Sequence, residues 1–353
     1  MKRVFLIPLM LVLAGALIFP GCARPAPTPS PGKAPLEVIE LKLAHHNSPT
    51  APIAVNGLNI YARMIEEATN HRVTVTLYPA QTLCKGADTY EAVTRGIAEI
   101  GWAYEGFFAG RFPLSSVMWL PCMGVPSSVI GGRILMDLYY KFPQLQAEYP
   151  GVKVLFLDSQ TPAFVATSKK PVRTLEDLRG LKLRITGAGP TEFMVAQGVS
   201  PVSVGPGDMY TNMQKGVIDG YAIDWEGLDG YKMYDVTRYV TNCKWYVSPF
   251  FLVMNLDKWN SLPPDIQKAI DSVSGYVGAR IIDKSQDDAE APVRKKLADL
   301  GIEVIEPTPQ ELARWTEAAK PLRDKWIAEM EGKGLPGKAV YNEFVRLIGE
   351  YTK

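Results

Sequence analysis

One arginine, Arg184, stands where an expected strand ends and a glycine-rich turn begins. The apolar residues of 181–185 alternate onto one face of that strand, which places Arg184 on the other face. The turn 186–190 leads into a helix, and ligands of open α/β sheets bind beyond the carboxyl ends of strands, often at a helix N-terminus. A guanidinium presents a planar fork of donors that matches a carboxylate. The spacing is compatible with carboxylate binding at Arg184, but taken alone it favours an exposed or structural arginine.

The sequence contains none of the common catalytic motifs. It has no Gly-x-Ser-x-Gly elbow, His-Glu-x-x-His, phosphate loop or Cys-x-x-Cys, and Gly187-Ala188-Gly189 lacks the third glycine of a dinucleotide fingerprint. His45 and His46 are adjacent on a strand, so they point to opposite sides and cannot easily chelate one metal. These absences favour a binding protein over an enzyme, and an exported hydrolase is the alternative from another class.

Composition excludes several classes of protein. The 353 residues include 38 Lys+Arg against 37 Asp+Glu, with 47% apolar and 21% charged side chains. Wholesale disorder needs fewer apolar residues and a larger net charge, and nucleic-acid binding needs a basic surplus. The length suits two domains. If two of the three cysteines Cys84, Cys122 and Cys243 form a disulfide, the third thiol stays unpaired, and the sequence does not show which two would pair.

The N-terminus carries an export signal. Lys2 and Arg3 precede the uncharged apolar run 4–19, so residues 1–21 are predicted to be a signal peptide. Cys22 follows as in a bacterial lipobox and is predicted to be lipidated, although Phe19 and Pro20 depart from the usual pattern; a plain signal peptide is the alternative. Residues 22–37 are predicted to form a lipid-anchored linker, whose proline-rich part 23–35 would extend over roughly 40 Å at ~3.1 Å per residue.

From residue 38 onward, short β-rich runs alternate with helical patterns, which predicts an α/β fold with crossover connections. Strands are expected at 38–43, 72–78, 98–103, 152–157, 163–167, 181–185, 221–223, 250–254 and 302–305. Helices are expected at 51–69, 89–95, 130–141, 175–178, 190–197 and 209–214. One long amphipathic helix is expected over 264–300, with Ile266, Ile270, Val273, Val277 and Ile281 on its apolar stripe. Thr308-Pro309-Gln310-Glu311 is typical of a capping box that opens a last helix to about residue 330.

Five segments carry a family resemblance. They are "LAHHNSPTAP", "RGIAEIGWA", "GRFPL", "SKKPVRTLEDLRGLKLRITG" and "DMYTNMQKGVIDG". Over roughly residues 40–300 the chain resembles the solute-binding proteins of tripartite ATP-independent periplasmic (TRAP) transporters, of the C4-dicarboxylate-binding-protein type. The stretch 170–184 is the most specific part.

The resemblance implies a bilobal periplasmic-binding-protein fold, with two α/β lobes joined by crossing strands and a long helix spanning both. Lobe I is expected to comprise 38–160 plus 249–282, and lobe II 161–248 plus 283–353 with the C-terminal helices. Such proteins are not enzymes: they capture a small organic acid outside the cytoplasm and deliver it to ion-gradient-driven permease subunits. A binding lipoprotein of an ATP-driven importer or a chemosensor is the alternative within the same fold.

The resemblance also assigns residues. Arg184 corresponds to the family's carboxylate-clamping arginine. Many relatives have a second arginine and an asparagine where this chain has Ala163 and Ile223. These departures argue against a sugar acid, weaken the case for a dicarboxylate and favour a monocarboxylate with an apolar or aromatic body.

Further cleft residues are expected around this clamp. Trp225 is expected to stack on the ligand, with hinge packing as the alternative, and Glu226 or Asp224 to accept a ligand hydroxyl or amine. Some relatives hold a metal cation between a carboxylate here and the ligand, but no metal is expected in this chain. The remaining ligand-binding predictions are Asn47 and His46 after the first strand, Tyr104 after the third, and Phe251 from the pair Phe250–Phe251.

Overall fold

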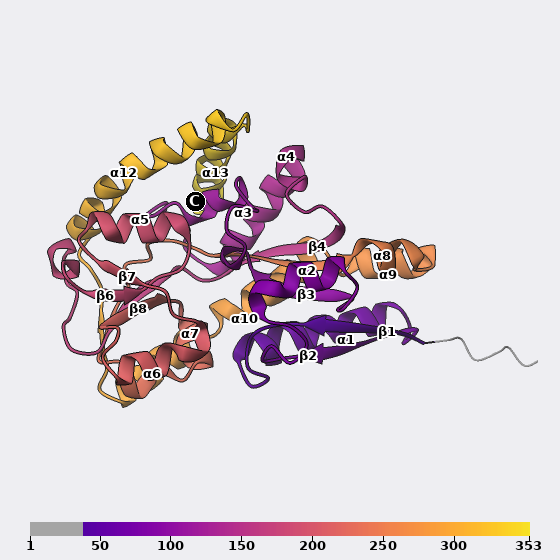
Figure 1. The fold of residues 1–353 in the computed structure, drawn as a ribbon, viewed down its shortest axis with the longest axis horizontal. Coiled ribbons are helices and arrows are strands. Elements are labelled where there is room, and N and C mark those ends of the chain that lie inside the picture. Colours follow the sequence, from indigo (N-terminus) through magenta and orange to yellow (C-terminus); the bar gives the residue numbers. More distant parts are fainter. Residues whose placement is uncertain (1–37) are drawn as a thin grey trace, which may run out of the picture. The chain divides into compact units, whose positions relative to one another are not determined.

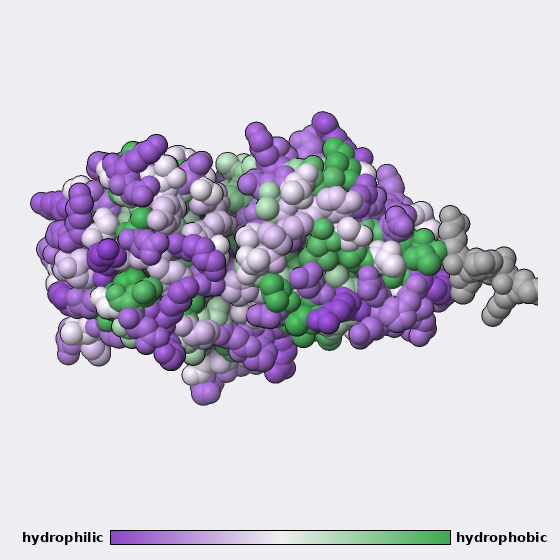
Figure 2. Space-filling view, turned by 90° about the horizontal axis from the view of Figure 1, so that it is seen from below, coloured by the Kyte–Doolittle hydropathy of each residue, from purple (hydrophilic) through white to green (hydrophobic). Residues whose placement is uncertain are grey.

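The computed structural model describes residues 38–353, which form one compact unit. The predicted signal peptide, the lipidated Cys22 and the linker therefore lie outside the described residues. Within 38–353, no helix is long and apolar enough to cross a membrane. The face drawn in Figure 2 is largely hydrophilic, with apolar residues gathered in small separate patches.

The first sheet has the strand order β2-β1-β3-β10-β4. Its strands are β1 (Ile39–Ala44), β2 (Val73–Tyr78), β3 (Ile100–Tyr104), β4 (Val152–Ser159) and β10 (Pro249–Asn255). β1 runs parallel to both β2 and β3, whereas β10 is antiparallel to β3 and β4. The returning strand β10 lies between β3 and β4 and is buried along its whole length.

The second sheet has the strand order β11-β9-β5-β8-β6-β7. Its strands are β5 (Phe164–Thr167), β6 (Lys182–Arg184), β7 (Ser200–Val202), β8 (Gly220–Ile223), β9 (Tyr239–Thr241) and β11 (Glu303–Ile305). β6 is parallel to β7 and β8, so the carboxyl ends of these three strands share one edge. We refer to the first sheet with its helices as lobe I and to the second as lobe II.

Helices follow most strands. Lobe I contains η1 (Ala54–Leu58), α1 (Asn59–Ala68), η2 (Gly86–Asp88), α2 (Thr89–Thr94), η3 (Glu105–Phe107), η4 (Ser115–Trp119), α3 (Ser128–Lys141), α4 (Pro143–Gln146) and α8 (Leu256–Ser261). Lobe II contains η5 (Leu175–Leu178), α5 (Ala188–Ala196), η6 (Pro206–Asp208), α6 (Met209–Gln214), α7 (Trp225–Gly230) and η7 (Met233–Val236). The tail adds α9 (Pro264–Ser272), α10 (Tyr276–Asp287), α11 (Glu290–Asp299), α12 (Pro309–Gly332) and α13 (Gly337–Tyr351).

Two crossing segments join the lobes. The chain passes from β4 to β5 through 160–163 and returns from β9 to β10 through 242–248. The segments hydrogen-bond to one another, with Gln160 N–H donating to the Ser248 carbonyl at 2.9 Å and Ala163 N–H to the Tyr246 carbonyl at 2.8 Å. The expected arrangement of two α/β lobes joined by crossing strands is therefore present.

The prediction of a single helix over 264–300 is wrong, because the structure has three helices in this segment: α9, α10 and α11. Gly275 separates the first two with φ 59° and ψ −134°, a conformation that side chains with a Cβ rarely adopt. The break also rotates the apolar stripe, because Ile266 and Ile270 are buried while Val277 is 48% exposed.

The C-terminal helices contact both lobes (Figure 1). Thr308 caps α12 by accepting the Glu311 N–H at 3.2 Å, as predicted, with Pro309 in the first turn. The reciprocal half of the capping box is absent, because the Glu311 carboxylate accepts the Leu175 N–H at 2.7 Å instead. α12 packs against α5, while α13 packs against α3, so the segment 283–353 contributes to both lobes.

Candidate functional site

A small cavity of about 50 Å³ lies where the two lobes and the crossing segments meet. Lobe I contributes His46, Tyr104, Phe107 and Phe250. Lobe II contributes Arg184, Thr186, Pro206, Ala222, Ile223, Asp224 and Tyr231. The crossing segments contribute Gln160, Ala163, Tyr246 and Ser248. The cavity therefore lies beyond the carboxyl ends of β6 and β8, where ligands of open α/β sheets bind.

Arg184 is the cation of this cavity. It is the last residue of β6 and only 6% exposed. Its Nε donates to the Val204 carbonyl at 3.3 Å, which fixes the plane of the guanidinium. Within 38–353, Arg184 has no ion-pair partner and no second hydrogen bond. A buried cation without a counter-ion favours an anionic ligand, because the pair would offset the cost of burial.

Hydroxyl groups surround the guanidinium. The Tyr104 hydroxyl is buried and makes no hydrogen bond to any described residue. Burial raises the pKa of Tyr104, and the nearby Thr186, Arg184 and Ser248 act in the opposite direction. Burial likewise raises the pKa of Tyr246. Both phenols are therefore neutral at physiological pH, so they can donate hydrogen bonds to a carboxylate beside Arg184.

Stacked rings form the wall on the side of lobe I. The His46 and Trp102 rings lie 5.2 Å apart and nearly parallel, and those of Trp102 and Phe250 lie 4.6 Å apart. Phe107 meets His46 edge-on at 5.2 Å. Burial lowers the pKa of His46 to about 3, so its ring is neutral. The Trp102 Nε1–H donates to Asp158 at 3.0 Å, which holds the stack in place. This wall suits a flat, apolar ligand body.

A carboxyl group lies at the end of β8. One oxygen of Asp224 accepts the Gly227 N–H at 2.8 Å and caps α7, while the other is buried without a partner among the described residues. Burial raises the pKa values of Asp224 and Glu226, and their mutual repulsion raises that of Glu226 further. Because its second oxygen has no partner among the described residues, Asp224 can accept a hydrogen bond from a donor group on a ligand.

The structure brings only some of the predicted residues to the cavity. Arg184, His46 and Tyr104 line it. Asn47 does not, but its side-chain oxygen accepts a hydrogen bond from Tyr231, a lining residue, at 3.1 Å. Glu226 also lies outside the lining and accepts the Ile53 N–H at 3.2 Å.

Trp225 and Phe251 point away from the cavity. Trp225 packs against Phe164 at 4.5 Å and beneath the Arg294 guanidinium at 4.4 Å, which corresponds to the packing alternative. Phe251 lies in the core of lobe I against Tyr90, at 5.6 Å. Neighbouring residues on a strand face opposite sides, so Phe250, and not the predicted Phe251, reaches the cavity.

Several lining residues escaped the sequence analysis. Thr186 directly follows the predicted arginine, so its place in the turn was a usable signal. Gln160, Tyr246 and Ser248 belong to the crossing segments, whose irregular backbone has no periodicity to show which side chain faces inward.

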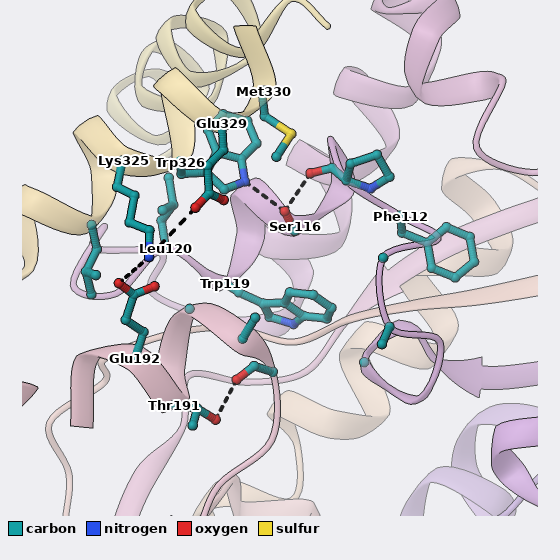
Figure 3. Close-up of a pocket in the computed structure, with 18 of the residues that line it drawn as sticks. Phe112, Ser116, Trp119, Leu120, Thr191, Glu192, Lys325, Trp326, Glu329 and Met330 are labelled. Carbon is teal, nitrogen blue, oxygen red and sulfur yellow. Dashed lines mark hydrogen bonds and ion pairs between the residues drawn. The ribbon is translucent and has the colours of Figure 1, made fainter. Parts of the chain in front are cut away.

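A larger groove of about 680 Å³ runs between η4, α5 and α12 (Figure 3). Trp119, Trp326 and Met330 supply much of its apolar lining. Lys325 lies between two acids, 2.7 Å from Glu192 and 3.7 Å from Glu329. Because this cation is already paired, the smaller cavity at Arg184 is the better carboxylate site. No cluster of three potential metal ligands occurs within the described residues.

Comparison with known proteins places the chain among binding proteins. Residues 43–329 match the family model of the bacterial extracellular solute-binding proteins, family 7. A TRAP solute-binding protein from an unidentified marine microbe, specific for aromatic acid ligands and bound to 3-hydroxybenzoate, is 26% identical with a TM-score of 0.85; the match covers 90% of this chain and 99% of that one.

Two further relatives bind organic acids. A TRAP solute-binding protein from Bordetella bronchiseptica with bound mandelate is 25% identical with a TM-score of 0.82, over 89% of this chain and 99% of that one. A monocarboxylate 2-oxoacid-binding periplasmic protein from Nostoc sp. is 26% identical, over 82% of this chain and 78% of that one.

Proposed function

The chain belongs to family 7 of the bacterial extracellular solute-binding proteins, the binding proteins of TRAP transport, and on this premise we propose that its ligand is an aromatic monocarboxylate. Members of this family are binding proteins and not enzymes. In this proposal the acid enters between open lobes, Arg184 and the surrounding hydroxyls hold its carboxylate, and closure buries its ring against His46 and Phe250.

One observation carries the proposal: a buried arginine without a counter-ion faces a wall of stacked rings in a cavity of about 50 Å³. A second carboxylate would have no cation to meet, since Arg184 is the one lysine or arginine among the residues that line the cavity, and Ala163 and Ile223 add no polar group. The 3-hydroxybenzoate and mandelate held by the two similar structures each combine one carboxylate with one ring. Asp224 would accept a hydrogen bond from a hydroxyl on such a ligand.

Delivery and anchoring complete the proposal. The closed, loaded form passes its ligand to the ion-gradient-driven membrane subunits of a TRAP transporter, as membership of the family implies.

Residues 1–21 direct export, and a lipid on Cys22 holds the protein at the outer face of the cytoplasmic membrane through the linker 22–37. Cys22→Ser should release the protein from membranes; failure of wild-type protein to incorporate labelled lipid would contradict the anchor.

A thermal-shift screen tests the ligand class. Benzoate, 3-hydroxybenzoate and mandelate are compared with succinate, malate and glucuronate, each on wild-type protein and on Arg184→Ala. A cognate acid at 100 times its Kd stabilises the native state by ~2.7 kcal/mol. We expect stabilisation by the aromatic acids alone, and its loss in the variant. Stabilisation by succinate or malate, with none by the aromatic acids, would contradict the proposal.

A further inference from the structure

We propose that Glu226 is a latch between the lobes, whose carboxylate caps the first-lobe helix 52–68 and couples ligand capture to closure. The proposal rests on the proposed function, because the latch needs a ligand that draws the lobes together. Glu226 does not line the ligand cavity, so its effect on binding would be indirect and it acts as a positioning residue.

The latch joins two elements from different lobes. The Glu226 carboxylate on α7 of lobe II accepts the Ile53 N–H of lobe I at 3.2 Å, and both groups are buried. A second bond lies nearby: the Tyr231 hydroxyl, just after α7, donates to the Asn47 side chain at 3.1 Å. α7 and the residue that follows it therefore contact lobe I at two points, the start of the helix 52–68 and the loop before it.

The helix end is suited to a carboxylate. The helical stretch 52–68 begins with Pro52, which has no N–H, so Ile53 supplies the first free donor of this end. The aligned peptide dipoles leave a partial positive charge there, which attracts an anion or a carboxyl oxygen. No side chain of lobe I caps this end. The cap comes from lobe II, so it is complete only when the lobes are together.

α7 also connects the latch to the ligand. It begins directly after Asp224, which lines the cavity and caps α7 through the Gly227 N–H. Trp225 packs against Phe164 of β5, which attaches the helix to the second sheet. The cavity edge and the latch are therefore parts of one short rigid unit. Closure around a ligand brings Glu226 to Ile53 in the same movement.

Two substitutions test the latch. Glu226→Ala removes the acceptor, while Glu226→Gln keeps an acceptor oxygen without the charge. Asp229→Asn is the matched control, since Asp229 lies on the same helix but pairs only with Lys232, Lys296 and Tyr234 of its own lobe or the tail. Affinity and dissociation rate for benzoate are measured by calorimetry and stopped flow, and closure by small-angle scattering at saturating ligand.

We expect Glu226→Ala to weaken binding by roughly ten- to a hundredfold, mainly through faster dissociation. The ligand-saturated Glu226→Ala protein should scatter as a more open molecule than wild type. The affinity and scattering of Glu226→Gln should lie between those of Glu226→Ala and wild type, and the Asp229→Asn control should match wild type. Unchanged affinity and dissociation in both Glu226 variants would overturn the latch while leaving the proposed function intact. If wild type binds another acid of the screen and not benzoate, the latch is measured with that acid; the proposed ligand class fails only if that acid is succinate, malate or glucuronate. If Glu226→Ala does not fold, Glu226→Gln decides alone.

Discussion

The role that we propose for Arg184 depends on its position at the end of β6. The strand buries Leu183 toward the core and turns the guanidinium to the edge that β6 shares with β8. Its one protein hydrogen bond, to the Val204 carbonyl, leaves most of its donors for a ligand. An arginine in this position discriminates by charge and shape together, since its fork fits a carboxylate better than any neutral group.

Arg184→Ala should abolish most ligand binding without unfolding the protein. A bound carboxylate left buried without its partner costs ~2–5 kcal/mol, which is roughly thirty- to several-thousand-fold in Kd. Arg184→Lys should recover only part, because an ammonium lacks the planar fork. Calorimetry with the cognate acid measures the effect. Arg173→Ala, which removes an exposed pair with Glu303, is the control. Wild-type affinity in a folded Arg184→Ala protein would place the clamp elsewhere.

The neighbouring residues Phe250 and Phe251 should separate ligand binding from stability. Phe250→Leu removes a ring from the cavity wall, and losing an aromatic contact worth ~0.5–1.5 kcal/mol should reduce the preference for benzoate over cyclohexanecarboxylate by about three- to tenfold. Phe251→Leu alters only the core of lobe I, so it should lower the melting temperature and leave the ratio of affinities unchanged. The opposite pattern would mean that the two rings have been assigned to the wrong faces.

At the level of elements, the sequence predicted most strands and helices because apolar periodicity follows burial on one side. Its main failure, the helix over 264–300, shows the limit: Gly275 interrupts a pattern that looks continuous in composition. Within the site, the expected strand and turn placed Arg184 at the sheet edge where the cavity lies, and the family resemblance assigned it to the ligand. Tyr246 and Ser248 were not, because they face the cavity from a segment whose direction only the packed lobes determine.

Gly275→Ala should destabilise the protein. A Cβ would force a residue with φ 59° into a strained conformation and approach the Tyr140 hydroxyl to 2.9 Å. Strain of this kind costs ~1–3 kcal/mol, which thermal unfolding detects directly. Gly349→Ala is the matched control, because Gly349 lies in α13 with open space around it and should gain helix propensity. Equal melting temperatures for Gly275→Ala and wild type would contradict the strain.

At the scale of the whole molecule, four connections of the chain join the lobes. Two are the crossing segments, the third is the junction of α10, which packs on lobe I, with α11, which packs on lobe II, and the fourth is α12. The Trp315 ring of α12 packs on Phe193 of lobe II at 5.6 Å, while the Trp326 indole N–H donates to Ser116 of lobe I at 2.7 Å. Pro321 lies between these contacts and lacks the N–H that would complete the helix. Because one backbone hydrogen bond is missing at Pro321, α12 can bend there when the lobes move.

The protein should take up protons when its lobes close around a ligand. Burial raises the pKa values of Asp224 and Glu226 in the closed form, whereas exposed carboxyls titrate near ~4. Asp229 adds to the increase for Glu226 and Lys232 opposes it. A raised pKa favours the closed form at low pH, and this advantage is lost as pH rises through the raised values. Affinity should therefore fall from about pH 4, where the exposed carboxyls of the open form titrate, to about pH 8, the upper of the two raised pKa values, by at most tenfold per pH unit for each proton taken up.

Calorimetry in buffers of different ionisation enthalpy measures this proton uptake directly. The double variant Asp224→Asn with Glu226→Gln should bind with much less dependence on pH, because neither side chain titrates. A flat affinity profile for the wild-type protein over this range would show that the two carboxyls are already ionised in the closed form.

The groove of Figure 3 has an optical consequence. Trp119 of lobe I is buried in its wall with an indole N–H that has no partner among the described residues, and its carbonyl lies close to Gly189 of α5 in lobe II. Parting the lobes would admit water to this indole, and its fluorescence emission should shift to longer wavelength. The protein would then report its own opening and closing without a label, and Trp119→Phe should remove most of that signal while ligand capture continues.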